Sequence, residues 1–532
     1  MTKDQPEPEA KAAAEFLERD VPLSHSIIWR LQRDFYAQRG LKAWTEDLIP
    51  SYITSNPLIA EIYAEIVAAF FSDCASHSSS FYPPLSPDNP LRILELGSGT
   101  GKFACLFLRK LLALLRDRGI SRDSFRYTMT DCSEQVIAGW RTNPYLAEFV
   151  AAGILQFQAL CADENGLDAH IAGTLQHHAG GPLLVIANYV FDSLPQDAFA
   201  VEDGNISEVL VTVAGAADPI GPQALSYKNV SLAPQRYADP LWNKILEDYR
   251  LQLPSATVLF PAAALHVLQQ LQNSSDGRML VLAADKGFAY DDELSLARGA
   301  PPLEFHSGNC FSQIVNFDAI ARYLTEMGGV ALLPDKHFSP LSICGFLQSP
   351  NHIHFAATLA AYQEAQAQIG PDDVFTLLGW LHSHMAEMNV AQILAMLRLS
   401  GWDPVALMRI FPVLAPQLGM VNAERHDLRR AVMRIWDNNF PVNSSDNALA
   451  FDCGVILLGL RFFAEALPMF RESERMLGPS APTSYNLGLC ELGLGHDSAA
   501  LDYMNQAIEQ DPGFEPAGIS RQKLELAKGR NK

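Results

Sequence analysis

The sequence contains little cysteine and no long hydrophobic run. Its 532 residues include eight cysteines, spread from Cys74 to Cys490, and none of them form a C-x-x-C pair. This spacing argues against a zinc site or a thioredoxin-type motif. Thinly spread cysteines are typical of reduced thiols in the cytoplasm. No stretch of 18 apolar residues occurs, so the sequence predicts no membrane-spanning helix.

Positive charge is also scarce. The 39 lysines and arginines face 60 aspartates and glutamates, which gives a formal net charge of −21. Nucleic acids and anionic membranes are polyanions, so a chain of this charge is predicted to bind neither. The acidic N-terminus lacks the apolar core of a signal peptide and the arginines of a transit peptide. Residues 1–22 are therefore expected to form a flexible tail on a cytoplasmic protein.

The middle of the sequence alternates short apolar runs with helical stretches. Strands are expected at Leu91–Leu96, Phe125–Thr130, Ile154–Leu160, Leu183–Ala187 and Met279–Ala284. Alternation of this kind predicts an α/β domain with a Rossmann-like, doubly wound parallel sheet. Together with helices that precede the first strand, this domain is expected to cover residues 23–350.

Strand signals stop after residue 356, and an all-α region is expected to follow. Within residues 446–525, Gly454 and Gly488 are 34 residues apart, as are Ala466 and Ala500. A period of 34 with small residues at helix contacts is the signature of the tetratricopeptide repeat. The sequence therefore predicts a solenoid of this type. Residues 356–445 are either degenerate repeats or an unrelated helical bundle.

The most informative segment is a glycine-rich loop, Glu95-Leu96-Gly97-Ser98-Gly99-Thr100-Gly101, between an expected strand and an expected helix. A P-loop is excluded because Leu96 and Phe103 stand where it needs glycine and Ser or Thr. A dinucleotide loop that starts at Gly99 has Ala104 as its third small residue, a tolerated variant. This second reading stays open as a weaker alternative.

The pattern E-x-G-x-G-x-G after a strand resembles the first motif of class I methyltransferases that use S-adenosylmethionine. Bare backbone at Gly97, Gly99 and Gly101 lets the amino-acid part of the cofactor cross the turn without meeting a Cβ atom. The carboxylate of Glu95 can attract the cofactor's positive charge. Asp131, at the end of the next strand, can accept hydrogen bonds from two ribose hydroxyls, or alternatively cap the following helix.

Further site candidates follow later strands. Asp163 comes after the third strand and is expected near the adenine edge. Asn188 and Asp192 follow the fourth strand, whose carboxyl end faces the transferred methyl group in the class that the sequence resembles. We expect Asp192 to hold a cationic nitrogen or take its proton, and Asn188 to orient the nucleophile. The alternative is that both side chains cap the next turn.

Four segments, in order, resemble the MidA-like family of class I methyltransferases: Tyr52-Ile53-Thr54-Ser55, Asn188–Pro195, Asp285-Lys286-Gly287 and Val315–Ile320. This family includes a mitochondrial complex I assembly enzyme that methylates a protein arginine. The resemblance implies S-adenosylmethionine as cofactor and a protein side chain as substrate. It also implies that Thr54 closes over the cofactor, although ordinary helix capping is the alternative.

The sequence departs from this family at one position that bears on the substrate. Tyr189 stands where the family has glutamate, and a guanidinium group is best held by acidic partners. Methylation of a protein recruited by the repeats is the favoured interpretation. A small-molecule methyltransferase and a non-catalytic scaffold stay open as alternatives. The pairs His352/His354 and His382/His384 lack a third ligand nearby, so no metal is expected.

Overall fold

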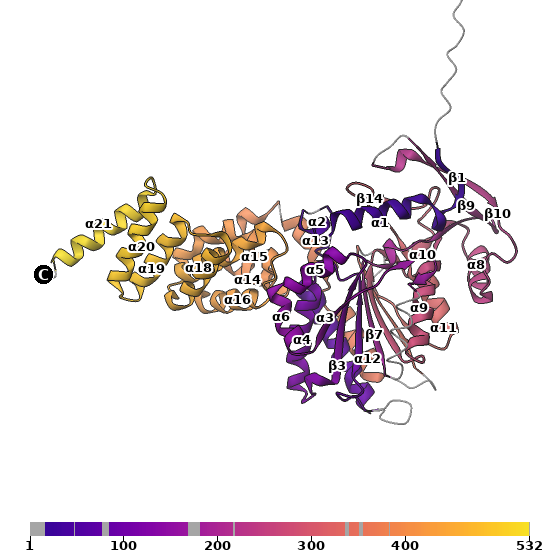
Figure 1. The fold of residues 1–532 in the computed structure, drawn as a ribbon, viewed down its shortest axis with the longest axis horizontal. Coiled ribbons are helices and arrows are strands. Elements are labelled where there is room, and N and C mark those ends of the chain that lie inside the picture. The colour runs from indigo at the N-terminus through magenta and orange to yellow at the C-terminus, as the bar shows by residue number, and fades with distance from the viewer. Residues whose placement is uncertain are drawn as a thin grey trace, which may run out of the picture.

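The computed structural model describes residues 16–46, 48–49, 51–76, 84–168, 181–215, 219–335, 340–349, 355–381 and 383–530. An α/β domain carries a long helical extension that ends at the C-terminus (Figure 1). The helices of the described residues include none long and apolar enough to cross a bilayer.

The central sheet has the strand order β17-β18-β12-β7-β2-β3-β4. Its members are β2 (Leu91–Leu96), β3 (Phe125–Asp131), β4 (Leu155–Ala159), β7 (Leu183–Asn188), β12 (Met279–Asp285), β17 (Val330–Leu332) and β18 (Ser342–Gln348). Strand β18 is antiparallel to both of its neighbours, and the pairs from β12 to β4 are parallel. The five predicted strands are confirmed. They read as continuous apolar runs because both faces of a parallel sheet are buried.

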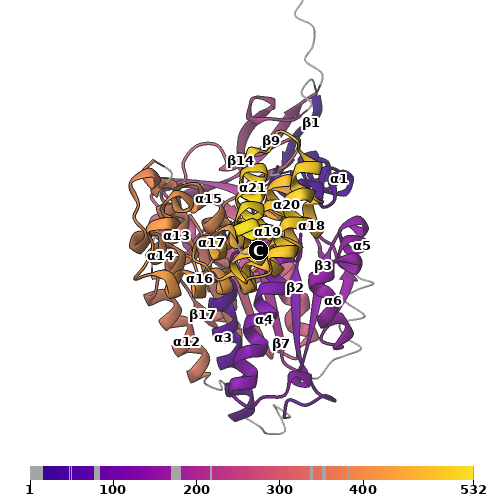
Figure 2. The same ribbon diagram turned by 90° about the vertical axis from the view of Figure 1, so that its left-hand side faces the viewer.

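Helices cover both faces of this sheet (Figure 1), and Figure 2 views the molecule from the side of the helical extension. Ile93 points into a core with α3 (Pro57–Ser76), α4 (Lys102–Asp117), α5 (Glu134–Thr142), α6 (Pro144–Ala151) and α12 (Ala356–Ala367). Its neighbour Leu94 points into the opposite core with α8 (Pro240–Gln252), α9 (Ala262–Ser274) and α11 (Phe317–Glu326). The alternation of side chains along β2 thus divides the core into two layers.

A second sheet, absent from the sequence prediction, lies beside the first. It has the order β1-β9-β8-β11 with β10 paired to β9. The strands are β1 (Phe16–Pro22), β8 (Asp197–Glu202), β9 (Asn205–Ala214), β10 (Leu225–Ser231) and β11 (Ser255–Phe260). Helix α1 (Ile27–Arg39) packs Trp29 against its valines. The predicted tail over residues 1–22 is therefore wrong for residues 16–22, which pair with β9; residues 1–15 lie outside the described residues.

The helical extension begins one helix later than the sequence suggests. Tyr362 of α12 packs into the sheet's core, so α12 belongs to the α/β domain. The extension comprises α13 (Pro371–Leu381), α14 (Val390–Leu399), α15 (Pro404–Leu414), α16 (Arg425–Asp437), α17 (Leu449–Gly459), α18 (Phe463–Leu477), α19 (Ala481–Gly493), α20 (Asp497–Gln510) and α21 (Glu515–Arg530). A Cβ atom on Gly454 would lie 2.8 Å from the ring of Phe470, and one on Gly488 would lie 3.1 Å from Met504 Cε. The same close helix contact therefore recurs after 34 residues.

The extension is docked on the α/β domain through polar contacts. The hydroxyl of Tyr52, in the loop before α3, donates to the carboxylate of Asp403 at the N-terminus of α15. The guanidinium of Arg109 in α4 donates to the carbonyls of Asp437 and Asn439 at 2.9 and 3.2 Å. These contacts hold α15 and α16 against the side of the sheet where its strands end.

Candidate active site

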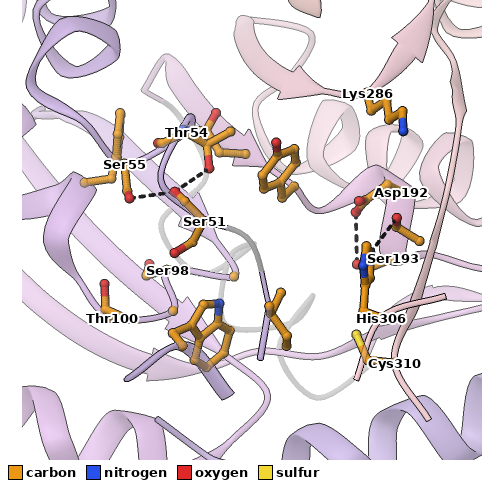
Figure 3. Close-up of a pocket in the computed structure, with 18 of the residues that line it drawn as sticks. Ser51, Thr54, Ser55, Ser98, Thr100, Asp192, Ser193, Lys286, His306 and Cys310 are labelled. Atoms are coloured by element: carbon orange, nitrogen blue, oxygen red, sulfur yellow. Dashed lines mark hydrogen bonds between the residues drawn. The ribbon is translucent and has the colours of Figure 1, made fainter. Parts of the chain in front are cut away.

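A cavity of about 330 Å³ lies at the carboxyl ends of β2 and β7. Open α/β sheets bind ligands at this edge, and the volume is within the range of small-molecule sites. Six predicted site residues line the cavity: Thr54, Glu95, Gly97, Gly99, Asn188 and Asp192. Thr54 and Ser55 occupy one wall, with Asp192 and Ser193 across from them (Figure 3).

The glycine loop has a conformation that other residues adopt poorly. Gly97 and Gly99 have φ values of +60° and +52°, a region costly for residues with a Cβ atom. The loop is fixed from behind, because the indole of Trp140 donates to the carbonyl of Gly99 at 2.8 Å. Gly101 was predicted to contact the cofactor, but it does not line the cavity. It precedes α4, where a Cβ atom would lie 2.9 Å from Met129 Cε.

The position and burial of Glu95 suit a carboxylate that pairs with the ammonium group of the expected cofactor. Its side chain is 4% exposed, and its Oε2 atom has no hydrogen-bond partner among the described residues. Burial raises the pKa of Glu95 to about 7, although the hydroxyls of Ser98 and Tyr127 act in the opposite direction. A buried carboxyl oxygen without a donor is stabilised by a ligand cation. The residues present therefore fit the amino-acid end of S-adenosylmethionine.

The two other predicted cofactor acids lie outside the cavity wall. Asp131 is buried behind the glycine loop, where it accepts the N–H of Ser133 at 2.9 Å and faces the N–H of Gly99. Burial raises the pKa of Asp131 to about 6. The cap of α5 is Ser133, so Asp131 does not cap this helix. Asp163 lies in a short hairpin, where it accepts the N–H of Asn165 at 2.7 Å. This contact stabilises the turn, and Asp163 does not line the cavity.

Asn188 ties the end of β7 to the Thr54 loop. Its Oδ1 accepts the hydroxyl of Tyr63 at 2.9 Å, and its Nδ2 donates to the carbonyl of Thr54 at 3.4 Å. Thr54 donates to the carbonyl of Ser51, whereas the cap of α3 is provided by Asn56, which accepts the N–H groups of residues 58 and 59. The capping alternative for Thr54 is therefore wrong. Asn188 instead positions the loop that closes one wall of the cavity.

Asp192 forms a carboxyl pair with Asp285, at the end of β12. The N–H of Asp192 donates to Asp285 Oδ2 at 3.1 Å, and Ser193 donates to Asp192 Oδ1 at 2.9 Å. Burial raises the pKa of Asp192 to about 7, and burial together with the neighbouring Asp192 holds the pKa of Asp285 well above its ordinary value. Two adjacent buried carboxyl groups cannot both ionise readily, so the pair holds a proton near neutral pH.

Several residues that line the cavity were not predicted from the sequence. Tyr36 of α1 and Trp44 of α2 (Lys42–Thr45) line it from the N-terminal segment, and Tyr36 contacts Cys310 Sγ at 3.5 Å. Glu304 of β14 (Leu303–Phe305) and His306 come from a hairpin with β15 (Phe311–Gln313). Glu304 pairs with Lys286, a residue of the third family-like segment. None of these segments carries a recognisable spacing, so only the fold brings them to the site.

Within the described residues, no cluster of three or more His, Cys, Asp or Glu side chains could hold a metal ion. The predicted H-x-H pairs are only partly covered by this finding, because His352, His354 and His382 lie outside the described residues.

Part of the chain matches a known protein family. Residues 75–298 match the family described as "Putative S-adenosyl-L-methionine-dependent methyltransferase". No curated protein matches the chain. A crystal structure of an uncharacterized protein from Burkholderia thailandensis shares 16% identity and covers 64% of this chain and 90% of its own, with a TM-score of 0.40. A second one from this organism, bound to S-adenosyl-homocysteine, shares 15% identity and covers 63% and 89%, also with a TM-score of 0.40.

The family match covers the region that contains the glycine loop and Asp192. The chain is an S-adenosylmethionine-dependent methyltransferase, and its cofactor is S-adenosylmethionine.

Proposed function

We propose that this methyltransferase acts on an arginine side chain of a protein. We further propose that α17–α21 are tetratricopeptide-type repeats, which bind the substrate protein. The observation that carries the proposal of a polypeptide substrate is a groove of about 640 Å³ between the α/β domain and the extension, which lines it chiefly with α15 and residues 442–452. It shares seven wall residues with the cavity: Trp44, Ile49, Ser51, Ser55, Tyr189, Pro340 and Phe375. A polypeptide in this groove can therefore place one side chain in the cavity.

Three carboxyl groups on or behind the cavity wall support a cationic acceptor. Asp192 and Glu304 line the cavity, Asp285 lies directly behind Asp192, and Lys286, which also lines the cavity, forms an ion pair with Glu304. Tyr189 replaces the family's glutamate, but Glu304 supplies a carboxylate from another element. Guanidinium groups are held best by carboxylates at hydrogen-bond distance. This arrangement supports arginine as the substrate side chain.

The chain's own residues perform three tasks in the transfer. The cofactor supplies a methyl group on a sulfonium. Asp192 accepts the proton that the acceptor nitrogen loses, which its pKa of about 7 allows at neutral pH. Asp285 holds the Asp192 turn through the N–H contact. Asn188 fixes the Thr54 wall, so that the nucleophile is positioned with water excluded.

Two further observations support the wider proposal. The repeated contacts of Gly454 with Phe470 and of Gly488 with Met504 support a solenoid of paired helices, whose surface suits a polypeptide partner. The eight cysteines are all free thiols, which supports a reducing, cytoplasmic location.

The test is methyl incorporation from isotopically labelled S-adenosylmethionine in a cell lysate. The proposal predicts label in protein, recovered as methylarginine after acid hydrolysis. Label found only in small molecules would favour the small-molecule alternative. Cofactor binding without any labelled product would favour the scaffold alternative.

A further inference from the structure

Two of the eight cysteines reach the surface, at the edge of the sheet that also carries the glycine loop. Cys132 is exposed and Cys161 is half-buried, whereas the other six cysteines are buried. They follow the neighbouring parallel strands β3 and β4, in which Asp131 is paired with Ala159. The pairing continues past the strands, because the N–H of Leu160 donates to the carbonyl of Asp131 at 3.1 Å. The strand register therefore brings the two cysteines together.

The side chains of these two cysteines interact. Cys132 Sγ donates to the carbonyl of Leu160, the residue before Cys161, at 3.6 Å. A hydrogen bond between the two thiols raises the pKa of Cys132 and lowers that of Cys161. Burial and two nearby aspartates oppose the lowering at Cys161, and Arg33 of α1 acts in the same direction as the hydrogen bond. Cys161 is therefore the sulfur that ionises first, with Cys132 as its proton-bearing partner.

The segment that carries Cys132 also supports the glycine loop. The N–H of Ser98 donates to the carbonyl of Thr130 at 2.8 Å, and the N–H of Thr130 donates to Ser98 Oγ at 3.2 Å. The carboxylate of Asp131 faces the N–H of Gly99. Cys132 is the next residue along the chain, so a movement of its backbone acts directly on the contacts that fix this loop.

We propose that Cys132 and Cys161 are a modification site, at which hydrogen peroxide forms a reversible disulfide that weakens binding of S-adenosylmethionine. The Cys161 thiolate attacks one peroxide oxygen, the O–O bond breaks, and the sulfur becomes a sulfenic acid while the released hydroxide takes up a proton. The Cys132 sulfur then attacks the Cys161 sulfur and displaces a second water molecule. The two thiols are oxidised by two electrons, and the peroxide is reduced to two molecules of water. A dithiol reductant reverses the modification.

Exposure favours this site over the other thiols of the chain. Redox-sensor cysteines are accessible to solvent and have a second cysteine beside them to form the disulfide. The six buried cysteines lack this access. In a reducing compartment a disulfide is formed transiently rather than as a permanent part of the fold.

The disulfide weakens cofactor binding through the backbone. It requires the two sulfur atoms to approach to about 2.0 Å in a restricted geometry, which is much closer than two hydrogen-bonded thiols. Residues 131–133 must therefore shift toward the end of β4. This shift disturbs the contacts of Thr130 and Asp131 with the glycine loop, whose conformation the cofactor site needs.

The proposal is tested with the full-length protein, first reduced with dithiothreitol, then freed of it and treated with hydrogen peroxide. Mass spectrometry should show the loss of two hydrogen atoms and a cross-linked peptide that contains Cys132 and Cys161. Calorimetry should show an affinity for S-adenosyl-homocysteine that is lower by about tenfold or more in the oxidised protein, and dithiothreitol should restore it. Cys132→Ser should fold, because this side chain is exposed, and should bind equally well before and after peroxide treatment.

Cys310→Ser is the matched control, because Cys310 lines the cavity and its own oxidation would also disturb binding. This variant should lose affinity on oxidation as the wild type does. Three results would overturn the proposal: no cross-link between Cys132 and Cys161, an oxidised protein with unchanged affinity, or a Cys132→Ser variant as sensitive to peroxide as the wild type. Loss of the sensitivity in Cys310→Ser would also overturn it, since the effect would then belong to the cavity thiol.

Discussion

The main-chain N–H of Asp192 donates a hydrogen bond to the buried carboxylate of Asp285 at 3.1 Å. Asp285 ends β12, and Asp192 lies in the turn that follows the adjacent parallel strand β7, so the two residues form one acid–base unit at the edge of the cavity. Neither carboxyl group could be assigned this partner from the sequence, since 93 residues separate them. The pair explains how a carboxyl group can act as a base near neutral pH.

The first prediction concerns Asp192. Asp192→Asn should leave the affinity for S-adenosyl-homocysteine nearly unchanged and reduce methyl transfer by about 100-fold or more, because the proton acceptor is lost. In the wild type, kcat should fall as the pH drops below about 7, since burial raises the pKa of Asp192 and protonation removes the base. Calorimetry measures the affinity for S-adenosyl-homocysteine, and pH–rate profiles measure how kcat depends on pH. Asp163→Asn, outside the cavity, should change neither property.

The second prediction concerns the glycine loop. Gly99→Val places a branched side chain at φ +52°, beside the cavity and 3.5 Å from Trp44. Binding of S-adenosyl-homocysteine should be lost. Gly119→Val is the matched control, because Gly119 has φ +69° but open space around it. This control should lose about 1–2 kcal/mol of stability from backbone strain and bind normally. Normal binding by Gly99→Val would show that the loop is not the cofactor site.

The third prediction uses the raised pKa of Glu95. Because only the ionised carboxylate can pair with the cofactor's ammonium, the affinity for S-adenosyl-homocysteine should rise between pH 6 and pH 8, around the Glu95 pKa of about 7. Binding at pH 6 should release a proton, measurable by calorimetry in buffers of different ionisation enthalpy. Glu95→Gln should bind more weakly and lose both effects. If the affinity of the wild type for S-adenosyl-homocysteine did not change with pH, Glu95 would not bind the cofactor's ammonium group.

Burial of the Glu95 carboxyl group should also make the stability of the fold depend on pH. A folded-state pKa above the unfolded value means that the native chain binds the proton more tightly, so the contribution of Glu95 to stability should fall as pH rises from about 4 to about 7. Urea unfolding across this range should show a smaller decline for Glu95→Gln than for the wild type. An identical decline in both would contradict the assignment.

The fourth prediction concerns the docking of the helical extension. Tyr52→Phe removes the hydroxyl that donates to the fully buried Asp403. Urea unfolding should show a loss of about 1–3 kcal/mol, the cost of removing a partner from a buried charged group. Tyr227→Phe, at a half-buried position of β10, should cost much less, because no hydrogen bond of its hydroxyl is seen among the described residues. Equal losses in the two variants would show that the Tyr52 contact does not stabilise the docking.

The sequence predicts the central sheet well because its strands are uninterrupted apolar runs such as Leu183–Ala187. The second sheet is not predicted: Leu225–Ser231 is mostly exposed and carries a weak signal, whereas Ser255–Phe260 is a buried apolar run left unassigned. Likewise, the sequence places Glu95 and Asp192 at strand ends, where the fold brings them to one cavity. Tyr36 and Glu304 reach the same cavity through packing between segments far apart in the chain, which no local spacing encodes.

The most direct measurement is a crystal structure of the protein with S-adenosyl-homocysteine. Our account predicts that the ligand's amino-acid end lies against Glu95 and the Gly97–Gly99 turn, with its sulfur facing the wall formed by Asn188 and Asp192. A ligand bound elsewhere, for example in the cleft between Arg109 and Trp402, would contradict this site. So would a sulfur atom that points away from Asp192.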